Sequence, residues 1–238
     1  MIGKDRIISF TFKFTYLDGK ETVFNINIEP VTMNLLHKND QELPEWVKLE
    51  KFKCSHCPLD TEKNVYCPVA VNLIDVIKEF NNVPSYEKVK IEVLSNERGY
   101  FKNADIQSGV SSLLGILMVT SGCPIMGKLK PMVRFHLPFA TLEETEFKVF
   151  SMYLLAQFIR KVHGKEPDWE LKNLAKIYDD IKILNQNVAA QIADLEARDA
   201  SINSVVVLNN FADIVTFNLE DQDLSNFINY YKNYLEEE

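Results

Sequence analysis

Two alternating segments joined by Asp18-Gly19 constrain the fold of this chain more than any other feature of its sequence. In residues 7–16, apolar side chains alternate with serine, threonine and lysine, and residues 22–28 repeat the pattern. Such alternation indicates a strand with one buried face. The Asp-Gly dipeptide tolerates the positive φ angles of a tight turn. The two segments therefore predict an antiparallel hairpin.

The remainder of the first 139 residues predicts both strands and helices. Residues 43–53 and 89–94 have the apolar spacing of strands. Residues 68–80 and 105–120 instead carry apolar side chains at helical spacing, and a strand is the alternative for residues 113–119. Pro68 suits the first position of a helix, which makes Cys67 the expected N-cap.

From Ala140 onward the sequence predicts helices only. Thr141 and Glu144 form a capping-box pattern that opens a helix ending near Val162. Pro167-Asp-Trp169 opens a longer helix of about 30 residues, whose apolar positions are close to a heptad seam. Two shorter helices are expected over residues 202–217 and 224–235.

The expected fold class is therefore α+β, with an N-terminal antiparallel sheet that carries one or two helices and a C-terminal helical bundle. We divide the chain into a cysteine-containing α+β region, residues 1–139, and an all-helical region, residues 140–238. The absence of a linker also allows one continuous domain.

The four cysteines are the candidate functional residues. Cys54 and Cys57 form a C-x-x-C pair, Cys67 follows closely, and Cys123 lies in a later Ser-Gly-Cys-Pro segment. Four thiolates can complete a tetrahedral zinc site or hold a four-iron cluster. The sulfurs of one zinc site would lie mutually within about 4 Å, since a Zn–S bond is about 2.3 Å long. We predict a metal site at these cysteines, with zinc ahead of an iron–sulfur cluster.

Other interpretations of the same residues remain open. The cysteines can be ordinary core residues with no cofactor, because free cysteine is among the most buried residue types. Cys54-Ser-His-Cys57 also has the spacing of a dithiol redox centre. His56 and His136 are accessory ligand candidates, although His56 more simply faces solvent and His136 more simply belongs to the core. A pair of Cys123 as nucleophile and His136 as base lacks an orienting third group.

Charge and composition narrow the function classes. The net charge of −8 argues against a nucleic-acid partner. The most apolar window, residues 110–120, is too short to cross a bilayer, and no signal peptide opens the chain, so we expect a cytoplasmic protein without membrane contact. Common enzyme motifs are absent from the sequence, which does not decide whether the chain is an enzyme.

The apolar stripe of the long helix has two interpretations. It predicts either an intramolecular bundle, or a protein partner or homodimer bound through the C-terminal helices.

Five short stretches carry a resemblance to a known family; they are Cys54-Ser-His-Cys-Pro-Leu59, Cys67-Pro-Val-Ala-Val-Asn-Leu73, Ser121-Gly-Cys-Pro124, Arg134-Phe-His-Leu-Pro-Phe-Ala140 and Pro167-Asp-Trp169. Through them the chain resembles, over nearly its whole length, a family of uncharacterised bacterial proteins, a domain of unknown function. The resemblance implies a single bacterial module whose cysteines belong together, and it implies no activity. The leading hypothesis is a metal-stapled, four-cysteine interaction or regulatory protein. The alternative is a thiol redox or iron–sulfur electron-transfer protein.

Overall fold

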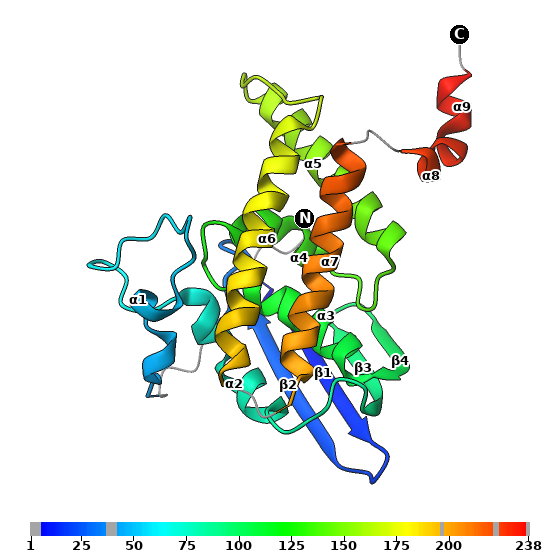
Figure 1. Cartoon of the computed structure of the whole chain (residues 1–238). Coiled ribbons are helices and arrows are strands. Elements are labelled where there is room, and N and C mark those ends of the chain that lie inside the picture. The colour runs from blue at the N-terminus through cyan, green and yellow to red at the C-terminus, as the bar shows by residue number, and fades with distance from the viewer. Residues whose placement is uncertain (1–5, 37–41, 196–197, 221–223, 237–238) are drawn as a thin grey trace.

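The fold is α+β, as predicted, and the computed structural model describes it over residues 6–36, 42–195, 198–220 and 224–236 (Figure 1). The strands form one antiparallel sheet in the order β2-β1-β3-β4. Their bounds are β1 Ile8–Tyr16, β2 Glu21–Ile28, β3 Lys88–Ser95 and β4 Gly99–Asp105. The N-terminal hairpin is confirmed: β1 pairs with β2, and the turn between them contains Gly19 with a φ of 86°.

One face of this sheet is buried and the other is half-exposed. On β1, Phe10, Phe12 and Phe14 are buried, whereas the side chains between them remain partly accessible. Ile91 and Val93 of β3 continue the buried face. This arrangement is typical of an antiparallel sheet that packs a single layer of helices on one side.

The helix α3 (Ile106–Val119) lies at the centre of the molecule and contacts three strands, α2 (Pro68–Phe80) and α7 (Ala200–Glu220). It is apolar on nearly all sides, which is the pattern of a fully buried helix. Gly109 allows α3 to approach the sheet closely, because a Cβ atom at this position would lie only 2.6 Å from Cε1 of Phe14. The Asn72 side chain joins α2 to α3 by donating to the carbonyl oxygen of Leu117 at 2.7 Å.

The second half of the chain is helical in its described part, as predicted. α6 (Lys172–Ala193) packs along α7, and Figure 1 shows this pair running side by side in front of α3. The apolar stripe of α6 is buried within the molecule, so the intramolecular alternative accounts for it. Because α3 contacts both the sheet and α7, it joins the two halves. The division near residue 139 stays a prediction.

α6 begins at Lys172 rather than at Pro167 because Leu171 has a left-handed backbone conformation, with a φ of 59°, and the first turn is then supported by Asp168. Its carboxylate accepts hydrogen bonds from the amides of Lys172 and Asn173 in the first turn of α6. The same carboxylate accepts from the Tyr153 hydroxyl of α5 (Leu142–Val162) at 2.7 Å. α5 itself begins at the predicted capping box of Thr141 and Glu144. Side chains therefore accept hydrogen bonds from first-turn amides of both helices, although only α5 has a capping residue of its own.

Two predicted elements are wrong. Residues 43–53 form the short helices η1 (Glu45–Val47) and α1 (Leu49–Phe52) instead of a strand, and only Lys48 keeps an isolated bridge, to Tyr66. Short helical turns and a strand can bury the same few apolar residues, so the pattern did not distinguish them. The last predicted helix is divided into α8 (Ser225–Ile228), η3 (Asn229–Tyr231) and α9 (Lys232–Leu235). Two further short helices, η2 (Met126–Leu129) and α4 (Lys130–Arg134), precede α5.

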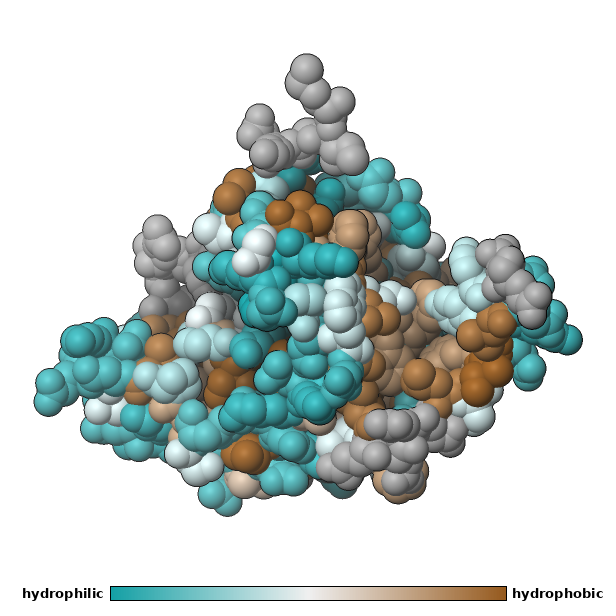
Figure 2. Space-filling model, turned by 90° about the horizontal axis from the view of Figure 1, so that it is seen from above, coloured by the Kyte–Doolittle hydropathy of each residue, from teal (hydrophilic) through white to brown (hydrophobic). Residues whose placement is uncertain are grey.

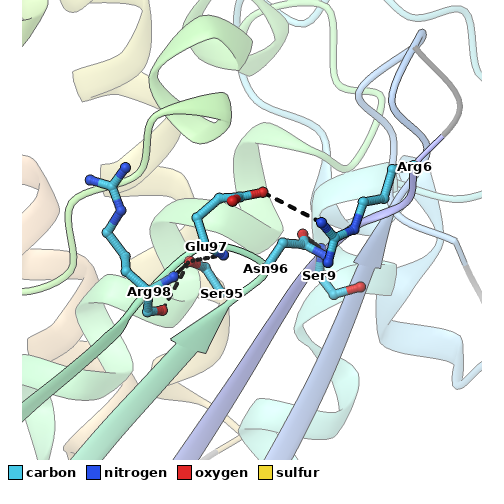
Figure 3. Close-up of polar contacts among 6 residues, drawn as sticks. All are labelled: Arg6, Ser9, Ser95, Asn96, Glu97 and Arg98. Atoms are coloured by element: carbon cyan, nitrogen blue, oxygen red, sulfur yellow. Dashed lines mark hydrogen bonds and ion pairs between the residues drawn. The ribbon is translucent and has the colours of Figure 1, made fainter. Parts of the chain in front are cut away.

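The edge strand β4 was not predicted, because it has little buried apolar surface. Phe101, in its middle, is 76% exposed. The strand forms because the β3–β4 turn is held by polar contacts, which Figure 3 shows. The Ser95 hydroxyl oxygen accepts from the amides of Glu97 and Arg98, and the Asn96 side chain accepts from the Ser9 amide of β1 at 2.8 Å.

The helix α7 is long and apolar enough to cross a bilayer by length and composition alone, and it is the one such helix within the described ranges. Its side chains Val205, Ala212 and Val215 are buried, and it packs against α3 and α6. These contacts are those of a helix that packs within the fold. The cytoplasmic compartment stays a prediction.

The packing of α3 predicts opposite effects for two glycine-to-alanine substitutions. Gly109→Ala should destabilise the protein by about 1–3 kcal/mol, because the added methyl group overlaps Phe14 and Ile91. Gly115→Ala should stabilise it by about 0.5–1 kcal/mol, because the nearest atom, Cδ2 of Leu208, lies at 3.9 Å and alanine favours the helix. Urea denaturation of both variants measures this difference. Equal effects would contradict the close approach of α3 to the sheet.

Candidate functional site

The four cysteines line one small cavity where α1, the start of α2, the loop after α3 and α6 meet. Its volume is about 10 Å³, and the other lining residues are almost all apolar. Cys54, Cys67 and Cys123 are buried, Cys57 is half-buried, and all four are free thiols. A cavity of this size accommodates about one small atom or one water molecule.

The backbone holds the first three cysteines in place. The Cys57 amide donates to the Cys54 carbonyl oxygen at 3.0 Å and closes the turn between them. The Cys67 amide donates to the Val47 carbonyl oxygen at 2.8 Å, and the Leu49 amide donates to Val65 in return. The segment that precedes the C-x-x-C pair is therefore bonded to the segment that carries Cys67.

Cys67 and Cys123 share a second local feature, because each is followed by proline and then by amides that act on its sulfur. For Cys67 these are the amides of Ala70 and Val69 at the start of α2. For Cys123 the corresponding amides belong to Met126 and Ile125. They favour the thiolate, although Cys67 forms no full capping hydrogen bond as the N-cap of α2.

Burial nevertheless dominates the acidity of these thiols. Desolvation, followed by the neighbouring Cys67, Cys123 and Cys57, raises the pKa of Cys54 to about 12. Desolvation likewise raises the pKa of Cys67 to about 11 and raises the pKa of Cys123. In the absence of a cation these three thiols are protonated at neutral pH.

The thiols are not arranged as a finished metal site. Across the described residues, no group of three or more His, Cys, Asp or Glu side chains is positioned to hold a metal ion. The four cysteines therefore line one cavity, but their sulfurs lack the arrangement that the sequence led us to expect for bound zinc. Coordination would require their side chains to turn toward one another, and the metal assignment stays a prediction.

The two accessory histidines lie outside the cysteine cavity. His56 is half-buried, and its Nε2–H donates to the Asp180 carbonyl oxygen of α6 at 2.9 Å, so it does not simply face solvent. Its Nδ1 is buried without a hydrogen-bond partner in the described part of the chain. His136 lines a second, larger cavity, whereas Cys123 lines the small one, which gives no support to a pair of Cys123 with His136.

The larger cavity, of about 240 Å³, was not predicted. It lies beside α3 and is lined by Lys102 of β4, by the segment from η2 to α5 and by residues of α6 and α7. In it the Ser112 hydroxyl and His136 Nε2 are 3.0 Å apart. The serines on one side of α3 and the histidine of the Arg134–Ala140 stretch were visible in the sequence, but nothing in it showed that they meet.

The chain belongs to a family described as a domain of unknown function, DUF6901, whose family model matches residues 10–232. This match confirms the resemblance to a family without a known activity. No curated protein and no solved structure matched the chain significantly. A proposal about function therefore depends on the chemistry and geometry of the chain's own residues.

The position of Cys67 in the small cavity predicts that it contributes to stability, whereas its neighbour in the C-x-x-C segment, Ser55, does not. Cys67→Ala should cost about 1–3 kcal/mol, because Cys67 is 7% exposed and lines the cavity. Ser55→Ala should change stability by less than about 0.5 kcal/mol, because Ser55 is exposed. Thermal or chemical denaturation measures both, and equally small effects would contradict a structural role for Cys67.

Proposed function

We propose that Cys54, Cys57, Cys67 and Cys123 bind one zinc ion as a tetrathiolate, and that this ion staples the fold of an interaction or regulatory protein. One observation carries the proposal: every cysteine of the chain lines the same atom-sized cavity. These cysteines come from segments separated by up to 69 residues (123 − 54). Ordinary core packing gives no reason for the whole cysteine complement to gather at one point.

The electrostatics of the cavity favour a bound cation. Burial makes the thiolates of Cys54, Cys67 and Cys123 costly in the protein alone. A divalent metal reverses this cost, because it binds the deprotonated sulfurs and releases their protons. The amides near Cys67 and Cys123 then supply outer-shell donors of the kind that support metal-bound sulfur.

The size and acidity of the site favour zinc over the alternatives. A volume of about 10 Å³ suits a single ion better than a cluster of iron and sulfide, which would have to expand the cavity. A dithiol redox centre needs a thiol with a lowered pKa, whereas the pKa of Cys54 is raised to about 12. A closed four-sulfur zinc site is structural rather than catalytic.

The consequence of such an ion would be a fixed junction between distant segments. It would connect the turn that follows α1 and the start of α2 to the loop that follows α3. α6 lies against this junction, since the Asn187 side chain donates to the Phe52 carbonyl oxygen at 3.0 Å and His56 donates to Asp180. The metal would thereby hold the helical layer in position, which is the role of a staple.

We further propose a second copy of this chain as the partner, bound through the second half of α5. Its apolar side chains are exposed to solvent, with Leu155 58% and Phe158 55% accessible. Exposed apolar residues on neighbouring turns mark an interaction surface. Residues 149–159 contain no charged side chain, so no repulsion between like charges of this stretch opposes its pairing with a second copy. Figure 2 shows hydrophobic patches among polar side chains on the face of the molecule that is seen from above.

The zinc proposal predicts about one zinc ion per chain in protein purified anaerobically and measured by mass spectrometry, without visible absorption. Chelation should unfold the protein, because the binding energy of a structural metal is part of its folding energy. Cys123→Ser should lose the metal, and Ser55→Ala, an exposed change within the C-x-x-C turn, should keep it. Protein without metal, or a Cys123→Ser variant that retains it, would contradict the proposal, and bound iron with a cluster spectrum would replace zinc by the iron–sulfur alternative.

The dimer proposal predicts twice the chain mass by light scattering at high protein concentration. Leu155→Glu should shift the equilibrium to monomer, because it places a charge in the centre of the uncharged surface. Lys165→Glu, an equally exposed change just beyond α5, should leave the mass unchanged. A monomer at all concentrations rejects this surface as a dimer interface.

A further inference from the structure

The larger cavity has apolar walls with a few polar groups, which is the composition of a small-molecule site. Its apolar walls are supplied mainly by Val119, Met126, Leu129, Val207, Leu208 and Phe211. Ser112 and His136 are hydrogen-bonded to each other on its surface at 3.0 Å. The His136 ring is also held from the sheet side by an edge contact with Phe10, at 5.7 Å between ring centroids.

Both charged side chains that line the cavity are positive. Its two charged lining residues are Lys102 of β4 and Lys148 of α5, and its lining contains no carboxylate. Lys148 is half-buried, and its ammonium group donates to the Phe135 carbonyl oxygen at 2.7 Å, which leaves further N–H donors for a ligand. Desolvation lowers the pKa of Lys148, and the negative charge of Glu144, one turn earlier on α5, offsets part of this effect.

Asn185 of α6 gives a second, independent indication of a ligand. The residue is only 2% exposed, it lines the cavity, and its Oδ1 atom has no hydrogen-bond partner within the described residues. A buried amide without its partner costs free energy. Because the oxygen and nitrogen of the amide group can exchange places, this side chain can meet either a donor or an acceptor atom of a ligand.

The volume limits the size of this ligand. An apolar cavity of about 150 Å³ accommodates benzene, with its six carbon atoms. By proportion, a volume of about 240 Å³ accommodates about ten non-hydrogen atoms. This is the size of a carboxylate with a chain of about eight carbon atoms.

We propose that this cavity binds a medium-chain alkyl carboxylate, with the carboxylate at Lys148 and the chain against the apolar residues of η2 and α7. The site is distinct from the cysteine cavity, and the proposal does not depend on a bound metal. The ligand would supply hydrogen-bond partners for polar groups such as Lys148 and Asn185, which lie on an otherwise mainly apolar surface.

Binding accounts for the Ser112–His136 pair better than acyl transfer does. A serine and a histidine within hydrogen-bond reach form part of a nucleophilic site. A general base works best when its pKa is close to the working pH. Desolvation, with a smaller contribution from Lys148, lowers the pKa of His136 to about 3, so its neutral ring is a weak base and serves as a hydrogen-bonding group.

Isothermal titration of the full chain with octanoate and with 1-octanol tests the proposal. Octanoate should bind saturably at about one molecule per chain. It should bind at least about tenfold more tightly than 1-octanol, because a charge-assisted hydrogen bond contributes only to the carboxylate. Absence of saturable octanoate binding, or equal affinity for the alcohol, would overturn the proposal.

Variants locate the binding to this cavity. Lys148→Met keeps the apolar stem and should reduce octanoate affinity at least about tenfold without changing the affinity for 1-octanol. Lys161→Met, an exposed change on the same helix, is the matched control and should bind like the original protein. Gly115→Leu should fill part of the cavity and reduce the affinity for both ligands. Gly115→Ala adds less volume and should reduce these affinities less. Circular dichroism checks that both variants fold. Octanoate binding that survives both Lys148→Met and the Gly115 changes would place the ligand elsewhere and refute the assignment.

Discussion

The close packing of α3 against the sheet is the constraint on which the other features depend. Gly109 removes the side chain that would collide with Phe14 and Ile91, so the helix can be buried on the sheet and still be covered by α7. One side of α3 then lines the larger cavity with Ser112, and its C-terminal end leads directly to the loop of Cys123. Both candidate sites are therefore positioned by the same helix.

The sequence predicted best those elements whose signals are local. The β1–β2 hairpin, the N-cap of α2 at Cys67 and the capping box at Thr141 each depend on residues a few positions apart. Prediction from the sequence failed for elements whose structure depends on residues far apart in the chain. β4 is held by its pairing with β3 and by the polar turn at Ser95, not by an apolar pattern of its own. The start of α6 depends on Asp168, whose carboxylate also binds Tyr153 of α5.

The two candidate sites were likewise predictable only as far as their signals are local in the sequence. The spacing of the cysteines predicted that they belong together, and they do line one cavity, but spacing could not show that the thiols stop short of a metal-binding arrangement. That arrangement depends on side-chain rotation and on the presence of a cation. The larger cavity could not be predicted, because Ser112, His136 and Asn185 come from separate elements that only the tertiary fold brings to one surface.

Together these features describe a member of a family without known activity, in which a thiol-lined cavity lies beyond the C-terminal end of one core helix and a larger cavity lies beside it. X-ray absorption spectroscopy at the zinc edge of the purified protein tests the central functional claim most directly. We predict about four sulfur neighbours at about 2.3 Å, the signature of a closed structural zinc site. Nitrogen or oxygen neighbours in place of sulfur, or protein that binds no zinc, would contradict the claim and leave the cysteines as buried thiols.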